Sequence, residues 1–174
     1  MKKILGVNGL YTHGGNNIDR LLWKLRDKGH IVGDIALPER GFISARWGAD
    51  DDAETIAKVS NDGDVLVAHS FGCLRAAEAM ELVDYSHVFM FAPAMQRGYD
   101  FGDQASKITC FHSHDDLAIL MGQLLLFHPF GAAGRKGFYD KRVKHVELSG
   151  GHNAYFEKWL HFCAIFVHDT LQPF

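Results

Sequence analysis

The chain has 174 residues, of which 47% are hydrophobic and 22% are charged, and its formal net charge at pH 7 is −3. This length suits one domain, residues 1–174, and the balanced composition excludes a disordered chain. The low net charge and the lack of long lysine and arginine clusters in the sequence argue against nucleic acid as a partner.

The sequence also lacks the features of membrane and disulfide-bonded proteins. No apolar run approaches the roughly 18 residues that a membrane span needs, and the N-terminus leads directly into a strand pattern rather than a secretion signal. We therefore predict no membrane span and a cytoplasmic location. Cys73, Cys110 and Cys163 lie far apart among apolar residues, which favours buried free thiols.

The chain begins with the pattern of a strand, a loop and a helix. Residues 3–7 are predicted to form a strand, which is apolar from residue 4 on. Residues 8–17 are rich in turn formers, and a helical apolar face extends from Ile18 to just before Gly29. The loop has neither the G-x-G-x-x-G nor the G-x-x-x-x-G-K spacing of phosphate-binding motifs. The sequence therefore does not favour a nucleotide site here.

A second strand and a second helix are predicted next. Residues 30–37 form a short strand pattern that stops at Pro38, and a helix is expected from about residue 53 to residue 60. Three consecutive aspartates precede that helix, and Glu54 lies three residues after Asp51. This arrangement is typical of an acidic helix start with a capping box rather than of a metal site.

The most informative stretch is residues 64–80, DVLVAHSFGCLRAAEAM. Residues 65–68 are apolar without polar alternation, which is typical of a strand covered on both faces of a parallel sheet. A helical pattern begins within a residue or two of Ser70, so the strand has to turn sharply into a helix. Small residues at Ala68 and Gly72 allow this close approach, and the turn places the Ser70 hydroxyl at its apex.

Three further strands are predicted, at residues 87–94, 107–111 and 143–148. The connection between the first two holds about a dozen residues, too few for a separate cap domain. Because strands alternate with helical segments throughout, we predict an α/β fold. It has a mostly parallel sheet of about six strands with helices on both faces.

The segments around the last strand have distinct compositions. Residues 117–130 are apolar and expected to be partly helical, and residues 131–137, with three glycines, are expected to form a surface loop. An aromatic stripe at helical spacing predicts that one face of a C-terminal helix lies in the core. Its members are Tyr155, Trp159, Phe162 and Phe166.

A serine at the carboxyl end of a parallel strand, above a helix N-terminus, suits acyl-transfer chemistry. Unpaired backbone N–H groups and the positive end of the helix dipole can stabilise an oxyanion there. The hydroxyl is a poor nucleophile at neutral pH and needs a base and a group that orients the base. Asp115, Asp116 and His152 follow later strands, so we expect them at the same edge of the sheet as Ser70.

Several motifs resemble those of the α/β-hydrolase family. Residues 68–72, AHSFG, resemble its nucleophile elbow, G-x-S-x-G, with alanine in place of the first glycine. Residues 149–152, SGGH, resemble the turn that carries the family's histidine, and residues 111–116, FHSHDD, are similar to the loop that carries its acid. The order Ser, Asp, His is also the family's. The resemblance covers nearly the whole chain and implies a minimal α/β-hydrolase fold without a cap domain.

The resemblance implies a role for each member of a triad. Ser70 would attack a carbonyl carbon, His152 would accept and return the proton, and Asp116 would orient the imidazole. Asp116 is favoured over Asp115, because the family's acid lies three residues after a small residue at the strand end, here Ser113.

The same resemblance implies an oxyanion hole made of backbone N–H groups. One donor would be the N–H of Phe71, the residue after the nucleophile, and the other would come from the loop after the first strand. Many family members carry His-Gly where this chain has Asn8-Gly9, so Leu10 is the first candidate and Tyr11 the second. Tyr11 is also expected to border the substrate.

These expectations describe a serine hydrolase, similar to carboxylesterases and lipases, that needs no cofactor and no metal. It would cleave small-molecule carboxylic esters with small to medium acyl groups through an acyl-enzyme intermediate. Thioesters and amides stay open as substrates, and the oligomeric state is not predicted.

Two alternatives remain open at the level of sequence. His112, His114 and Asp116 match the first part of the H-x-H-x-D-H signature of metallo-β-lactamase-like hydrolases, although Leu117 stands where the next histidine ligand should be. The chain could also be a non-catalytic binding module with an α/β-hydrolase-like fold.

Overall fold

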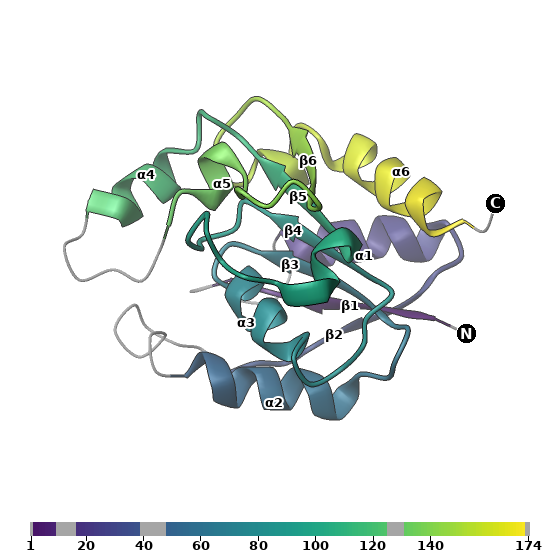
Figure 1. Ribbon diagram of the computed structural model, residues 1–174. Coiled ribbons are helices and arrows are strands. Elements are labelled where there is room, and N and C mark those ends of the chain that lie inside the picture. The colour runs from purple at the N-terminus through teal and green to yellow at the C-terminus, as the bar shows by residue number, and fades with distance from the viewer. Residues whose placement is uncertain (1, 10–16, 39–47, 125–130, 173–174) are drawn as a thin grey trace.

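The computed structural model describes residues 2–9, 17–38, 48–124 and 131–172, and a six-stranded sheet lies at its centre (Figure 1). The strands lie in the order β2-β1-β3-β4-β5-β6, and every neighbouring pair is parallel. They are β1 (Lys3–Val7), β2 (Ile31–Asp34), β3 (Val65–His69), β4 (His87–Phe91), β5 (Ile108–His112) and β6 (Lys144–Glu147).

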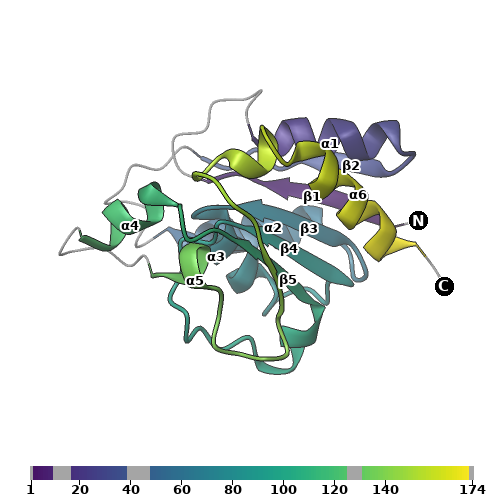
Figure 2. The same cartoon turned by 90° about the horizontal axis from the view of Figure 1, so that it is seen from above.

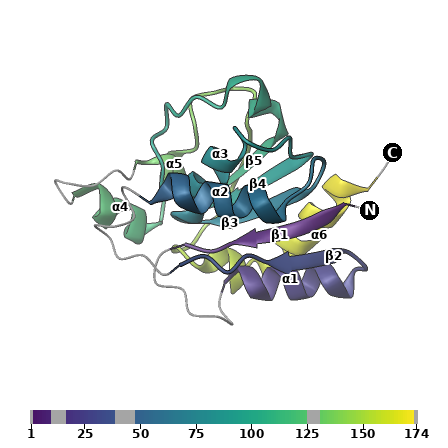
Figure 3. The same cartoon turned by 90° about the horizontal axis from the view of Figure 1, so that it is seen from below.

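Helices cover both faces of this sheet. The α-helices are α1 (Ile18–Asp27), α2 (Ala49–Val59), α3 (Gly72–Ala79), α4 (Leu117–Leu124), α5 (Ala133–Lys136) and α6 (Leu160–Leu171). Two short 3-10 helices are η2 (Gly102–Lys107) and η3 (Ala154–Phe156). Helices α1 and α6 lie together on one face, and α2 and α3 lie on the other, as Figures 2 and 3 show from opposite sides.

The apolar side chains of the strands point alternately into two cores, one on each face. Leu66 and Ala68 of β3 pack with residues of α2 and α3, whereas Val65 and Val67 pack with residues of α1 and α6. All five residues of β3 are buried. A strand that is covered on both faces needs a continuous apolar run, which explains the pattern in residues 65–68.

Because all six strands are parallel, their carboxyl ends lie at one edge of the sheet. The register aligns His69, the last residue of β3, with Phe91 of β4, and aligns Phe91 with Phe111 of β5. His112 at the end of β5 is aligned in turn with Glu147 of β6. The loops that follow β3, β5 and β6 therefore leave the sheet beside one another.

The predicted fold class is confirmed: one parallel sheet of six strands with helices on both faces. The observed β2 and β4 are shorter than the predicted strands. The predicted capping box is wrong, because α2 already begins at Ala49, after Gly48, and no side chain caps it. The aspartates lie inside the first turn of α2, where Asp52 is buried.

Two other expectations about the last third of the chain are corrected. Residues 131–137 are not a surface loop, because they include α5 and Gly131 is buried against the backbone of Met95 and Gln96. The aromatic stripe is only partly in the core: Tyr155 is fully buried, but Phe162 is 41% exposed. Residues 125–130 of the predicted apolar segment lie outside the described residues.

The expectation for the cysteines is met, because Cys73, Cys110 and Cys163 are buried free thiols. Within the described residues, none of the helices has the length and apolar character that crossing a membrane requires.

His87, at the start of β4, is a partly buried histidine whose charge affects stability. Its Nε2 lies 2.9 Å from the Thr109 hydroxyl, and its ring packs on Phe89 at a centroid distance of 4.3 Å. Burial, followed by the nearby positive charge of Lys144, lowers the pKa of His87 from 6.5 to about 4. The folded chain therefore keeps His87 neutral at pH values where the unfolded chain protonates it.

We predict that this difference makes the fold less stable as the pH falls from 6.5 towards 4, because the unfolded state then binds one more proton. His87→Gln cannot titrate, so it should remove about 1–3 kcal/mol of the loss in unfolding free energy over this range. Urea denaturation at pH 7 and pH 4.5 measures the effect. The exposed His161→Gln serves as a control, and an unchanged pH dependence in His87→Gln would contradict the prediction.

Candidate active site

Ser70 lies at the sharp turn between β3 and α3. Its φ of 56° is in the left-handed region, which side chains other than glycine rarely adopt. The Ser70 N–H donates to the Phe91 carbonyl at 2.9 Å, and the Ser70 carbonyl accepts from the N–H groups of Cys73 and Ala94, both at 3.1 Å. These bonds hold the backbone in its strained conformation and leave the Ser70 side chain half-buried at the sheet edge.

Glycines allow the chain to pass close to this turn on two sides. A Cβ atom on Gly72 would lie 2.5 Å from the Val7 carbonyl oxygen, so α3 can begin directly against the end of β1 only without a side chain there. A Cβ atom on Gly9 would lie 3.0 Å from the Ser70 Cβ and 3.5 Å from its Oγ. The backbone that leaves β1 therefore runs alongside the Ser70 hydroxyl.

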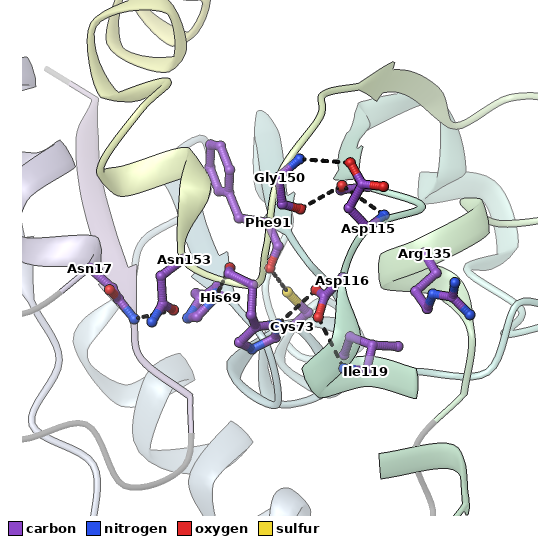
Figure 4. Close-up of polar contacts among 12 residues, drawn as sticks. Asn17, His69, Cys73, Phe91, Asp115, Asp116, Ile119, Arg135, Gly150 and Asn153 are labelled. Atoms are coloured by element: carbon purple, nitrogen blue, oxygen red, sulfur yellow. Dashed lines mark hydrogen bonds and ion pairs between the residues drawn. The ribbon is translucent and has the colours of Figure 1, made fainter. Parts of the chain in front are cut away.

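His152 and Asp116 form a hydrogen-bonded pair across two loops. The His152 Nδ1 lies 2.7 Å from the Asp116 Oδ2, and the Asp116 side chain is completely buried. The other carboxylate oxygen, Oδ1, accepts the backbone N–H of Ile119 at 3.0 Å, as Figure 4 shows. Because a carboxylate accepts, Nδ1 is the donor of this bond, and in the imidazole tautomer with the proton on Nδ1 the lone pair is on Nε2.

Asp115, in the same loop as Asp116, makes different contacts. It is exposed, and its Oδ2 accepts the backbone N–H of Gly150 at 3.2 Å (Figure 4). The Ser113 hydroxyl donates to the Gly150 carbonyl at 2.7 Å and accepts from the Asp115 N–H at 3.2 Å. Asp115 therefore joins the loop after β5 to the loop after β6, and the partner of His152 is Asp116.

Hydrogen bonds hold the loop that carries His152 at both of its ends. The indole N–H of Trp159 donates to the Ser149 carbonyl at 2.7 Å. The Asn17 side-chain amide donates to the Asn153 Oδ1 at 3.0 Å, which connects the loop to the start of α1. These bonds limit the positions that the imidazole can take.

His69 also contacts His152, and the sequence analysis does not predict this contact. Its ring centroid lies 4.6 Å from that of His152 and 5.0 Å from that of Phe156. The His69 Nε2 donates to the His152 carbonyl at 3.2 Å. Burial, and then the neighbouring His152, hold the pKa of His69 well below its usual value, so His69 is a neutral ring that packs against the imidazole. In the sequence, the only indication of this contact is that a histidine directly precedes Ser70.

The predicted oxyanion donors are placed only in part. Phe71 directly follows Ser70 with helical backbone angles of −65° and −25°, and its side chain is fully buried. Phe71 thus directly precedes the first residue of α3, and the role of its N–H as an oxyanion donor stays a prediction. Leu10 and Tyr11 lie outside the described residues, so their assignment stays a prediction.

Of the three side chains of the alternative metal site, His112 and His114 lie near each other, with ring centroids 6.3 Å apart, but Asp116 does not join them. The His114 Nε2 pairs with the Glu147 Oε1 at 3.3 Å, whereas Asp116 binds His152. The His112 ring packs near that of His145, at a centroid distance of 5.7 Å. Within the ranges that the structure describes, no group of three or more His, Cys, Asp or Glu side chains could hold a metal ion. The geometry therefore gives no support to a metal-dependent hydrolase.

Comparison with known proteins identifies solved structures with a similar fold. No family model matches the chain, and no curated protein matches its sequence. Among solved structures, the chain is similar to an extracellular α/β-hydrolase from a Paenibacillus species, with a TM-score of 0.61 and 13% identity over 97% of this chain and 98% of that one. It is also similar to a monoacylglycerol lipase from Paleococcus ferrophilus, with a TM-score of 0.60 and 13% identity over 96% and 94% of the two chains.

A third similar structure is the ydeN gene product from B. subtilis, with a TM-score of 0.62 and 17% identity over 98% of this chain and 97% of that one. Each likeness covers nearly all of both chains. The chain therefore has the α/β-hydrolase fold in a minimal form, and the resemblance drawn from its motifs is confirmed at the level of the fold.

The strain at Ser70 leads to a stability prediction. Glycine adopts a φ of 56° freely, so Ser70→Gly should have a larger unfolding free energy than Ser70→Ala, by about 1 kcal/mol. Ser60 has an ordinary φ of −100°, and there the glycine variant should be the less stable one. Thermal and urea denaturation of the four variants measures both differences. The same order of stability at both positions would contradict the strain at Ser70.

Proposed function

We propose that the chain is a serine hydrolase in which Ser70, His152 and Asp116 form a catalytic triad. The observation that carries the proposal is the 2.7 Å hydrogen bond between His152 and the buried Asp116, at the sheet edge where β3 presents Ser70. This bond fixes the tautomer in which Nε2 is the free base. The strained turn at Ser70 supports it, because such strain is common at catalytic nucleophiles.

The proposed reaction has two halves. Ser70 Oγ attacks the carbonyl carbon of an ester while His152 Nε2 takes its proton, and the carbonyl oxygen becomes an oxyanion. The intermediate collapses to an acyl-serine, and the alcohol leaves with the proton from His152. Water then attacks the acyl group with His152 again as base, which releases the acid and restores the hydroxyl.

Backbone N–H groups are the proposed donors to the oxyanion. Phe71 lies at the start of α3, where the helix dipole also favours negative charge. The second donor is proposed from the loop after β1, with Leu10 first and Tyr11 second. Gly9, which lies beside Ser70, brings that loop to the nucleophile.

The proposed substrates are small-molecule carboxylic esters with small to medium acyl groups. One of the similar structures is named a monoacylglycerol lipase, and another an α/β-hydrolase, which supports acyl-ester chemistry on this fold. Thioesters and amides share the same tetrahedral intermediate and belong in the same test.

The first test measures hydrolysis of p-nitrophenyl esters of graded acyl length. Wild type should hydrolyse the short and medium esters, and Ser70→Ala should lose roughly 10³-fold or more in kcat/KM, because no other group replaces the nucleophile. Parallel assays with a thioester and an anilide rank the leaving groups. Equal rates for wild type and Ser70→Ala would rule out the proposed function.

A second test separates the two neighbouring aspartates. Asp116→Asn should lower kcat by roughly 10³- to 10⁴-fold, since the amide would favour the wrong imidazole tautomer. Asp115→Asn is its matched control and should stay close to wild type, because Asp115 binds the Gly150 backbone and not the imidazole. The reverse order of the two effects would show that Asp115 is the catalytic acid.

A further inference from the structure

A buried ion pair lies behind the Ser70 turn and is not needed by the triad. Arg75 of α3 pairs its Nε with the Asp52 Oδ2 of α2 at 2.8 Å, and the two side chains are only 3% and 1% exposed. Burying two charges costs solvation free energy, and an apolar pair of similar size often stabilises a fold as well or better. The position of this pair therefore suggests a role beyond stability.

The guanidinium of Arg75 also reaches the end of β1. Its Nη1 donates to the Asn8 carbonyl at 3.3 Å. Arg75 and Ser70 lie on the same strand-to-helix unit, so this bond connects the nucleophile's own helix to the loop that passes it. Asp52 holds the other side of the fork and fixes the direction of the guanidinium.

The bond to Asn8 sets the orientation of one peptide group beside the nucleophile. The C=O of Asn8 and the N–H of Gly9 belong to the same planar trans peptide and point in opposite directions. With the carbonyl held towards Arg75, the Gly9 N–H is directed to the other side. Gly9 is also the residue that lies beside the Ser70 side chain, and Leu10 follows it.

Arg75 contacts the other side of the proposed oxyanion hole as well. Its Cζ lies 5.0 Å from the centroid of the Phe71 ring, within the range of a cation–π contact. The Phe71 ring also packs with Ala49, Ala94 and Ile119. One side chain thus contacts the Asn8 carbonyl at the end of β1 and the ring of Phe71 at the start of α3.

We propose that Arg75, held by Asp52, is a positioning residue that sets the orientation of the Asn8–Gly9 peptide and the place of Phe71 beside Ser70, where the oxyanion would form. The inference rests on the proposed function. Arg75 touches neither the substrate nor the reacting atoms; it acts through the Asn8–Gly9 peptide and through Phe71. Its loss should therefore weaken stabilisation of the transition state and leave the general base unchanged.

The decisive variant replaces both charges, Asp52→Leu with Arg75→Met, so that no single charge is left buried. The same two kinds of change on a more exposed pair, Asp140→Leu with Arg142→Met, form the matched control, because these side chains are 20% and 52% exposed. Active sites are counted by titration with a fluorophosphonate. Melting temperature, kcat and KM per titrated site, and the pH profile of kcat are then measured with p-nitrophenyl butyrate.

We expect the Asp52/Arg75 double variant to stay folded, with kcat per titrated site lowered about 10- to 100-fold, KM little changed and the pH profile unchanged in shape. The exposed-pair variant should match wild type. Arg75→Lys should fall in between, because an ammonium cannot hold Asp52 and Asn8 with a rigid fork. A purely structural role would lower the melting temperature or the number of active sites but not kcat per site.

Two results would overturn the inference. One is a folded double variant with wild-type kcat per titrated site, and the other is a shifted pH profile, which would place the effect on His152. If the double variant does not fold, wild-type kcat per site in Arg75→Lys overturns the inference in the same way. Failure of the proposed function is seen separately, because wild type itself would then neither hydrolyse esters nor react with the fluorophosphonate.

Discussion

The structure depends on how closely α3 can begin against β1. At Gly72 the backbone of the helix lies so near the Val7 and Asn8 carbonyls that a Cβ atom would meet both at 2.6 Å or less. That contact forces β3 to turn within one residue, and Ser70 absorbs the turn with a φ of 56°. The hydroxyl is therefore presented at the sheet edge by backbone geometry, and its position does not rely on the packing of its own small side chain.

Because the sheet is parallel, the side chains of Asp116 and His152 lie at the same edge as Ser70. Asp116 and His152 follow β5 and β6, the strands that lie beyond β4 from Ser70, and they meet through a 2.7 Å hydrogen bond. Around this bond, backbone and side-chain contacts from Ile119, His69 and Trp159 restrain the carboxylate, the imidazole and its loop. Proton transfer in the proposed triad needs this restraint, because the reacting groups of such a site must already be aligned when a substrate arrives.

Much of this was predictable from local patterns, and the exceptions have physical causes. The order of strands and helices and the turn at Ser70 follow from apolar runs and small residues, which act over a few positions. Asp52 and His69 were missed as buried contacts because their partners, Arg75 and His152, lie 23 and 83 residues away. The three glycines of residues 131–137 predict a surface loop, whereas in the fold Gly131 and Gly134 are needed for close packing against other backbone.

Ser70 and His152 are proposed to act together at this edge, and site-specific labelling can test their cooperation. A fluorophosphonate incubated with the native chain should form one adduct, located at Ser70 by peptide mass spectrometry. The adduct should form far more slowly in His152→Ala, because the hydroxyl loses its base. Labelling at Ser70 that proceeds equally fast without His152, or no labelling at Ser70 at all, would contradict the proposed cooperation of Ser70 and His152.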